Sequence, residues 1–109
     1  MMNDSMVVEK HRRLAELHQE LATLGPVIRG SVVVIGTRNK QPYFSLNKGG
    51  KTKLVYLGKN NARESLAQMY SDNYKRLQAI VEEMTEVNME LLKNITGGKP
   101  RVPVIANEE

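Results

Sequence analysis

The sequence predicts an α+β fold: an N-terminal helix, a three-stranded antiparallel β-meander and a long, coiled-coil-like C-terminal helix. Two observations support this fold class: the spacing of apolar residues changes twice along the chain, and basic residues gather in its middle. Apolar residues recur at helical spacing in both terminal parts of the chain, and β-branched and alternating segments lie between them. From Leu21 through Arg63 the chain contains eight Lys and Arg residues and no Asp or Glu. We therefore expect the central meander to be a basic module.

The first helix is expected over residues 5–24. Its apolar positions follow in steps of 7, 3, 4 and 3 and form one stripe on a helix face: Val7, Leu14, Leu17, Leu21 and Leu24. Asp4 or Ser5 is the expected N-cap, because a short side-chain oxygen can accept a free backbone N–H there. Gly25-Pro26 ends the helix, since proline cannot continue its hydrogen-bond ladder.

The meander is expected over residues 31–58, with strands at 31–35, 42–47 and 52–57. Gly49-Gly50 supplies the positive φ angles of a two-residue hairpin turn. That turn pairs Phe44 with Val55 and Tyr43 with Tyr56. The side chains on one face are then Phe44, Leu46, Val55 and Leu57, and those on the other are Tyr43, Ser45, Asn47, Thr52, Leu54 and Tyr56.

The long helix is expected over residues 61–95, with Asn60 or Asn61 as its cap. Heptad spacing predicts a homo-oligomer interface at Tyr70, Tyr74, Leu77, Val81, Met84, Asn88, Leu91 and Ile95. A single Asn in such a seam fixes the register of paired helices. Leu66, Ile80 and Val87 widen the stripe on one flank, so we also expect this helix to pack antiparallel against the first one. Residues 1–95 are expected to form a single domain and residues 96–109 a flexible tail.

Composition excludes several classes of protein. The chain has no Cys, which rules out disulfides, thiolate zinc sites and a cysteine nucleophile. No apolar run reaches the roughly 18–20 residues of a membrane span, so a cytoplasmic protein is expected. His11 and His18 are two helical turns apart, too far to share one ion. No nucleophile and base converge in the pattern, so we expect no enzyme, cofactor or metal.

The net charge of +4 hides a one-sided distribution, because the segment from Leu21 through Arg63 is +8 on its own. Such a surface favours a polyanion, and nucleic acid is the commonest one. The expected contacts are Arg29, Arg38, Lys40, Tyr43, Lys48, Lys51, Lys53, Tyr56 and Lys59. The cations would contact phosphates, and the two tyrosines would contact sugars or stack on bases. An alternative role for the lysines is to keep exposed strand edges from aggregating.

Five segments resemble a small prokaryotic family of uncharacterised proteins, a domain of unknown function found around phages, transposases and other mobile elements. The segments are residues 24–31, 42–46, 50–57, 73–77 and 88–92. Many members of that family place cysteines in the first hairpin turn, which suggests a zinc knuckle. Here that turn is Thr37-Arg38-Asn39-Lys40, so a metal role does not carry over. Residues 31–70 also resemble the three-stranded arm-binding domain of phage integrases, which binds DNA with its sheet.

The function expected from these observations is non-enzymatic nucleic-acid binding, with DNA as the expected ligand and a homodimer as the expected assembly. Two alternatives belong to other classes. One is a phage or mobile-element inhibitor that blocks a host protein, and the other is a sponge for an anionic nucleotide signal. A steep fall of binding affinity with salt concentration would distinguish nucleic-acid binding from these two alternatives.

Overall fold

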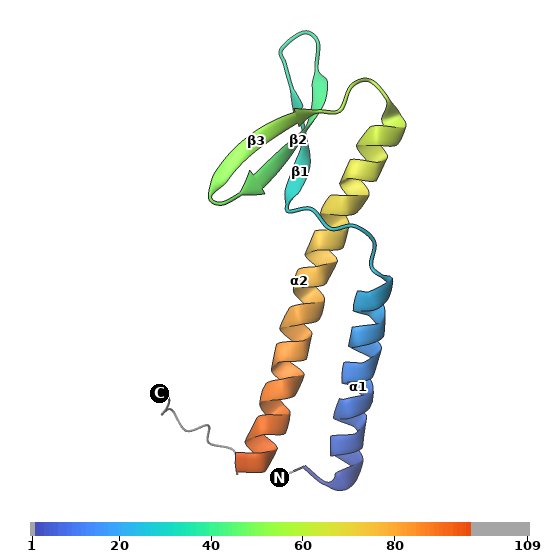
Figure 1. Cartoon of the computed structure of the whole chain (residues 1–109), viewed down its shortest axis with the longest axis vertical. Helices are drawn as coiled ribbons and strands as arrows, with labels where there is room; N and C mark the ends of the chain where they lie inside the picture. Colours follow the sequence, from blue (N-terminus) through green and yellow to red (C-terminus); the bar gives the residue numbers. More distant parts are fainter. Residues whose placement is uncertain (1, 97–109) are drawn as a thin grey trace. The chain divides into compact units, whose positions relative to one another are not determined.

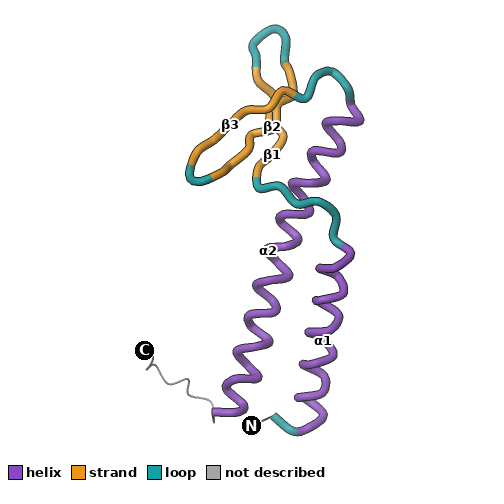
Figure 2. The backbone as a smooth tube through the Cα atoms, viewed as in Figure 1, coloured by secondary structure: helices purple, strands orange, loops and turns teal. Residues whose placement is uncertain are grey.

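The computed structural model describes residues 2–96 and confirms the α+β element order (Figure 1). The elements are α1 (Asp4–Thr23), β1 (Gly30–Ile35), β2 (Gln41–Lys48), β3 (Lys51–Tyr56) and α2 (Asn61–Thr96). Two helices flank a single run of strands along the chain (Figure 2). Of the expected tail, only Thr96 is described, and it is the last residue of α2; residues 97–109 lie outside the described part.

The chain divides into two compact units. Residues 23–79 form one, which we call the sheet unit; it contains the three strands and the first half of α2. Residues 2–22 and 80–96 are the described part of the other, the helical unit, which contains α1 and the second half of α2. The expectation of a single domain over 1–95 stays a prediction.

α1 begins one residue earlier than expected because Asn3 is its N-cap. The Asn3 Oδ1 atom accepts the backbone N–H of Met6 at 2.8 Å, and the Asn3 carbonyl accepts that of Val7 at 3.1 Å. The prediction of Asp4 or Ser5 as the cap is therefore wrong. Asp4 instead occupies the first turn, where its negative charge faces the positive end of the helix dipole.

Within the helical unit, α1 packs antiparallel to residues 80–96. Leu17 of α1 and Ile80 of α2 are fully buried. Polar contacts link the two helices in antiparallel order: Met2 N donates to Asn94 Oδ1 at 3.0 Å, Lys10 pairs with Glu90, and Arg13 Nε donates to Glu83 Oε2 at 2.6 Å. The expected antiparallel packing is confirmed.

The side of α2 that packs on α1 is the flank beside the predicted seam, as the width of the apolar stripe indicated. Ile80 and Val87, on that flank, are 0% and 8% exposed. Val81, in the predicted seam, is 48% exposed. The side chains beside Ile80 and Val87 therefore meet α1, and those around Val81 lie outside that contact.

The sheet has the strand order β1-β2-β3, with both pairs antiparallel. Phe44 pairs with Val55 and Tyr43 with Tyr56, as predicted. Gly49 and Gly50 have φ angles of 59° and 77°, the left-handed values that a tight two-residue turn requires. The register of β2 and β3 thus follows directly from the Gly-Gly turn.

The segment before β1 is hydrogen-bonded to α2 within the sheet unit. Three contacts join them: Ile28 N to Tyr70 O at 3.2 Å, Ser71 Oγ to Gly30 O at 2.6 Å, and Asn73 Nδ2 to Pro26 O at 3.0 Å. α2 itself begins at a confirmed cap, because Asn60 Oδ1 accepts the Ala62 N–H at 2.8 Å. The first three bonds hold the segment that enters β1 against the first half of α2.

The core of the sheet unit is small. Phe44 is 5% exposed and Ala67 9%, and the Ser71 side chain beside them is 1% exposed. A Cβ atom on Gly30 would lie 2.3 Å from the Ser45 carbonyl oxygen and 2.6 Å from the Phe44 ring. Gly30 therefore lets the start of β1 approach Phe44 closely.

Candidate nucleic-acid interface

The division into units coincides with a division of charge. The sheet unit has ten Lys and Arg residues against two acidic ones, a net charge of +8. The described part of the helical unit has four basic and eight acidic residues, a net charge of −4. The first half of α2 adds two basic and two acidic residues beyond Arg63, so it does not dilute the positive charge of the meander. The candidate interface lies on the sheet unit.

Four of the expected contact residues lie at the hairpin end of the sheet. Lys48 pairs directly with Lys51 across the turn, and Lys53 lies two residues further along β3. The backbone oxygen of Arg29 accepts the N–H of Asn47 at 3.1 Å, which places Arg29 at the same end. All four cationic side chains are exposed. We call Arg29, Lys48, Lys51 and Lys53 the hairpin cluster.

Three further expected residues lie at the opposite end. Arg38 and Lys40 belong to the loop between β1 and β2, and Lys59 follows β3. Leu57 N donates to Pro42 O at 3.1 Å, so the chain leaving β3 passes the start of β2. We call Arg38, Lys40 and Lys59 the loop cluster. β2 is eight residues long, so about 23 Å of strand separates the two clusters.

The cations of both clusters lack acidic partners. Among the described residues, none of the seven side chains of the hairpin and loop clusters forms an ion pair. The helical unit differs, because Lys10, Arg12 and Arg13 all pair with glutamates there. Unpaired cations are available to an external anion without breaking an internal contact.

Tyr43 and Tyr56 lie side by side but not with the lysines. Their ring centroids are 5.3 Å apart with a tilt of 53°, and the Tyr56 hydroxyl donates to Gln41 Oε1 at 2.9 Å. The pairing register puts both rings on the face opposite Phe44. Lys51 and Lys53 lie at odd spacings from Tyr56 along β3, so their side chains point to the Phe44 side of the sheet. The structure therefore groups the tyrosines together and the hairpin lysines together, but on different faces.

The tyrosine face carries no charged side chain from the strands. Its polar members include Gln41, Ser45, Asn47 and Thr52, and Thr52 Oγ1 donates to Asn47 Oδ1 at 3.1 Å. Amide and hydroxyl groups both donate and accept hydrogen bonds, as the edges of bases do. Tyr56 is 53% exposed, so part of this face is open to a ligand. Ile35 and Leu54 lie on the same face and are 42% and 49% exposed, so the surface between the two basic ends is uncharged and mixes polar with apolar side chains.

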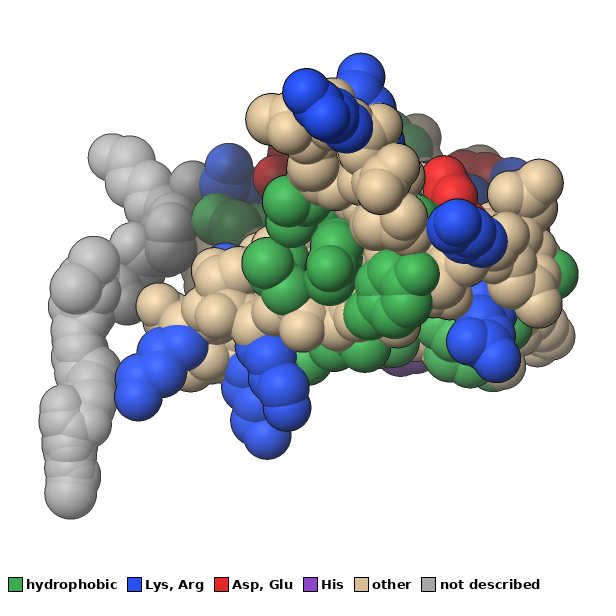
Figure 3. Space-filling view, turned by 90° about the horizontal axis from the view of Figure 1, so that it is seen from above, with side chains coloured by type: hydrophobic (Ala, Val, Ile, Leu, Met, Phe, Trp, Pro, Cys, Tyr) green, Lys and Arg blue, Asp and Glu red, His purple; other side chains and the backbone are tan. Residues whose placement is uncertain are grey.

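The other face of the sheet forms an apolar groove with α2, of about 320 Å³. Phe44, Leu46, Val55 and Leu57 line it from the sheet side, and Leu66 and Tyr70 from α2. Seen from above, hydrophobic side chains gather in a patch with Lys and Arg side chains around it (Figure 3). The alternation along the strands predicted the four residues that line its sheet side, but not the groove itself, which depends on how the first half of α2 packs on the strands.

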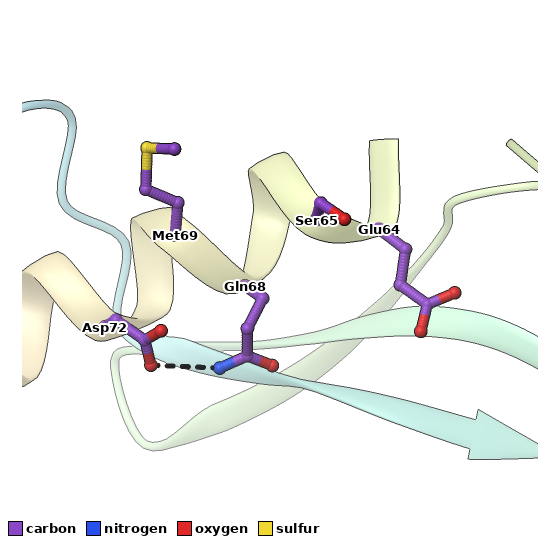
Figure 4. Close-up of a pocket in the computed structure, with 5 residues that line it drawn as sticks. All are labelled: Glu64, Ser65, Gln68, Met69 and Asp72. Atoms are coloured by element: carbon purple, nitrogen blue, oxygen red, sulfur yellow. Dashed lines mark hydrogen bonds between the residues drawn. The ribbon is translucent and has the colours of Figure 1, made fainter. Parts of the chain in front are cut away.

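A second hollow, of about 400 Å³, follows one side of α2 (Figure 4). It contains Glu64 and Asp72, the two acidic residues of the sheet unit, and Gln68 Nε2 donates to Asp72 Oδ1 at 3.0 Å. Negative charge there would repel phosphates. This side of α2 is therefore excluded from the candidate interface.

The predicted oligomer seam is partly open in the single chain. Val81 is 48% exposed, Ile95 is 80% exposed, and Asn88 is also exposed. The remaining seam residues are half-buried: Tyr70, Tyr74, Leu77, Met84 and Leu91. The predicted homo-oligomer stays a prediction.

The chain matches no protein-family model, no curated protein and no solved structure. The family resemblances drawn from the sequence stay predictions. Among the described residues, no helix combines the length and the apolar character needed to cross a membrane.

Proposed function

We propose that this protein binds nucleic acid, with duplex DNA as the preferred form, through the sheet unit and without catalysing a reaction. One observation supports this most directly: a net charge of +8 on one unit, with seven exposed cations that have no acidic partner among the described residues. A purely solubilising role for lysine would not require the acidic residues to be absent across the whole meander. Release of counterions from the nucleic acid would drive the binding.

The placement of the clusters favours a duplex. About 23 Å separates the two ends of β2, which exceeds the major groove width of about 12 Å. The hairpin cluster and the loop cluster can then reach phosphates on opposite sides of one groove. The neutral tyrosine face between them offers amide and hydroxyl groups for base edges. In this arrangement the tyrosine face contacts the bases, and the hairpin lysines, which lie on the Phe44 side, would reach the phosphates around the end of the sheet.

The test is a titration of the protein against labelled duplex DNA, single-stranded DNA and RNA at several salt concentrations. We expect the duplex to bind tightest, and log K to fall linearly with log salt. Lys51→Glu should weaken binding and lower the magnitude of the salt slope by about one unit. Lys93→Glu is the matched control: it makes the same charge change in the helical unit and should leave the slope nearly unchanged.

Two results would overturn the proposal. If no nucleic acid binds at low salt, a protein-interaction role or capture of a small anionic nucleotide replaces it. Equal losses for Lys51→Glu and Lys93→Glu would mean that only the total charge matters, and the sheet would not be the contact surface.

A further inference from the structure

The apolar groove of the sheet unit has a size and lining that suit protein side chains. Its volume of about 320 Å³ lies at the lower end of the roughly 300–1,000 Å³ typical of small-molecule sites. Val55 and Leu66, on its two sides, are 41% and 46% exposed, so the groove is open to solvent. The Arg63 side chain also lines it and adds a positive charge. A helix with an exposed apolar face would complement this surface.

The helical unit exposes such a segment at the end of α2. Asn88, Leu92 and Ile95 follow at spacings of four and three, which places them on one helix face. Leu92 is 48% exposed and Ile95 80%, so α1 leaves this face uncovered. Glu86 and Glu90 lie on the opposite side of α2, and Glu90 pairs with Lys10 of α1, so the face around Leu92 and Ile95 is apolar. An amphipathic helix with anchors at this spacing is a common occupant of apolar grooves.

We propose that the groove receives the end of α2, around Leu92 and Ile95, from a second copy of the chain, and that the two copies pair antiparallel along α2. Charge decides the orientation. A parallel pair would bring the two +8 units together, and the two −4 units together. An antiparallel pair places each +8 unit opposite a −4 unit. Two-fold symmetry then fills both grooves with the same contact.

The absence of Cys from the chain gives a direct test of orientation. A disulfide requires two Cα atoms within about 7 Å, so its yield reports proximity. We expect Leu66→Cys mixed with Leu92→Cys or with Ile95→Cys to form a mixed disulfide under mild oxidation. Each variant alone should stay uncrosslinked. Self-crosslinking of each variant would show a parallel pair and overturn the proposal.

A second measurement tests the contact without crosslinking. Ile95→Asp should weaken the dimer at least about tenfold in sedimentation, because a charge would enter the apolar groove. Val8→Asp is the matched control, since Val8 is 66% exposed on α1 and undergoes the same change. Equal effects of the two variants, or a wild-type chain that stays monomeric at about 10 µM or above, would overturn the proposal. No nucleic acid is present in either experiment, so the result is independent of the proposed function.

Discussion

At the scale of single residues, the ion pair between Lys10 and Glu90 joins the two helices of the helical unit. The hydrogen bond from the Lys10 side chain, and then its charge, lower the pKa of the Glu90 carboxyl below its ordinary value of 4.5. A carboxyl whose pKa is lowered by folding adds stability above its unfolded pKa. That stability is lost as the pH falls through the folded pKa. The contribution is small, because Glu90 is half-exposed and solvent screens the pair.

Glu90→Gln should therefore lower the melting temperature slightly at neutral pH, and the difference from the wild type should vanish in acid. The measurement is thermal unfolding by circular dichroism from neutral pH to well below 4.5. Glu86→Gln is the control, because this substitution also removes one negative charge from α2. Glu86 forms no ion pair among the described residues. A Glu90→Gln deficit that persists unchanged in acid would contradict the ion-pair explanation.

Caps and close contacts show how far a sequence specifies single residues. Asn60, one of the two adjacent residues expected to cap α2, is confirmed as the cap. Asn3, Asp4 and Ser5 can all cap a helix, and only the geometry of the first turn selects Asn3. The sequence did not mark Gly30 as important, because its lack of a side chain matters only once Phe44 and Ser45 lie against it. Such contacts depend on packing between segments distant in the chain.

At the scale of elements, the sequence predicted both the β2–β3 pairing and the flank of α2 that packs on α1. Gly49-Gly50 admits few turn geometries, so it fixes which residues pair. The apolar surface of α2 is wide enough that either the Ile80 side or the Val81 side could face α1. The contacts of Arg13 with Glu83 and of Lys10 with Glu90 accompany the Ile80 side. The heptad positions alone do not decide between the two sides, but Ile80 and Val87 do, because they widen the apolar stripe on one flank.

Adjacent substitutions in α2 test this assignment. Ile80→Ala should cost about 2–5 kcal/mol of unfolding free energy, because it removes a fully buried side chain. Val81→Ala should cost about 0.5 kcal/mol or less in dilute solution, since Val81 is 48% exposed in the single chain. Urea unfolding at low protein concentration measures both. A larger cost for Val81→Ala than for Ile80→Ala would mean that the helix is rotated, with Val81 against α1.

The cost of Val81→Ala should also depend on concentration if a second copy covers that face. Association stabilises the folded chain more as the protein concentration rises. The deficit of the variant should then grow on concentration, whereas that of Ile80→Ala should change little. This comparison separates burial within one chain from burial between copies.

At the scale of the whole molecule, the basic segment from Leu21 through Arg63 lies almost entirely within the sheet unit, which extends further, to residue 79. The sequence showed a basic middle and acidic flanks, but not that the first half of α2 joins the basic part. Nor did it show that the cations separate into two clusters. That division follows from the strand register, which places Arg29 beside the hairpin, and from the return of the chain past Pro42. The candidate contact residues were thus predictable individually, and their grouping required the fold.

The two clusters lead to a prediction about nucleic-acid binding as a whole. Replacing Lys48, Lys51 and Lys53 with Glu changes the net charge by six, as does replacing Arg38, Lys40 and Lys59 with Glu. If both ends of the sheet contact one duplex, each triple variant should lower the magnitude of the salt slope by about three units. Helical circular dichroism should be unchanged, because these cations form no ion pairs among the described residues. Salt-dependent titrations of the two variants in parallel measure the effect.

The comparison has a distinct outcome for each arrangement. A loss confined to the hairpin triple would mean that the sheet approaches DNA with one end only, and the groove-spanning arrangement would be wrong. If neither triple changes the binding, the lysines serve only to keep the sheet edges from associating. Equal losses from both triples, with unchanged folding, are what the spacing of about 23 Å along β2 predicts, because cations at both ends would contact phosphates at once.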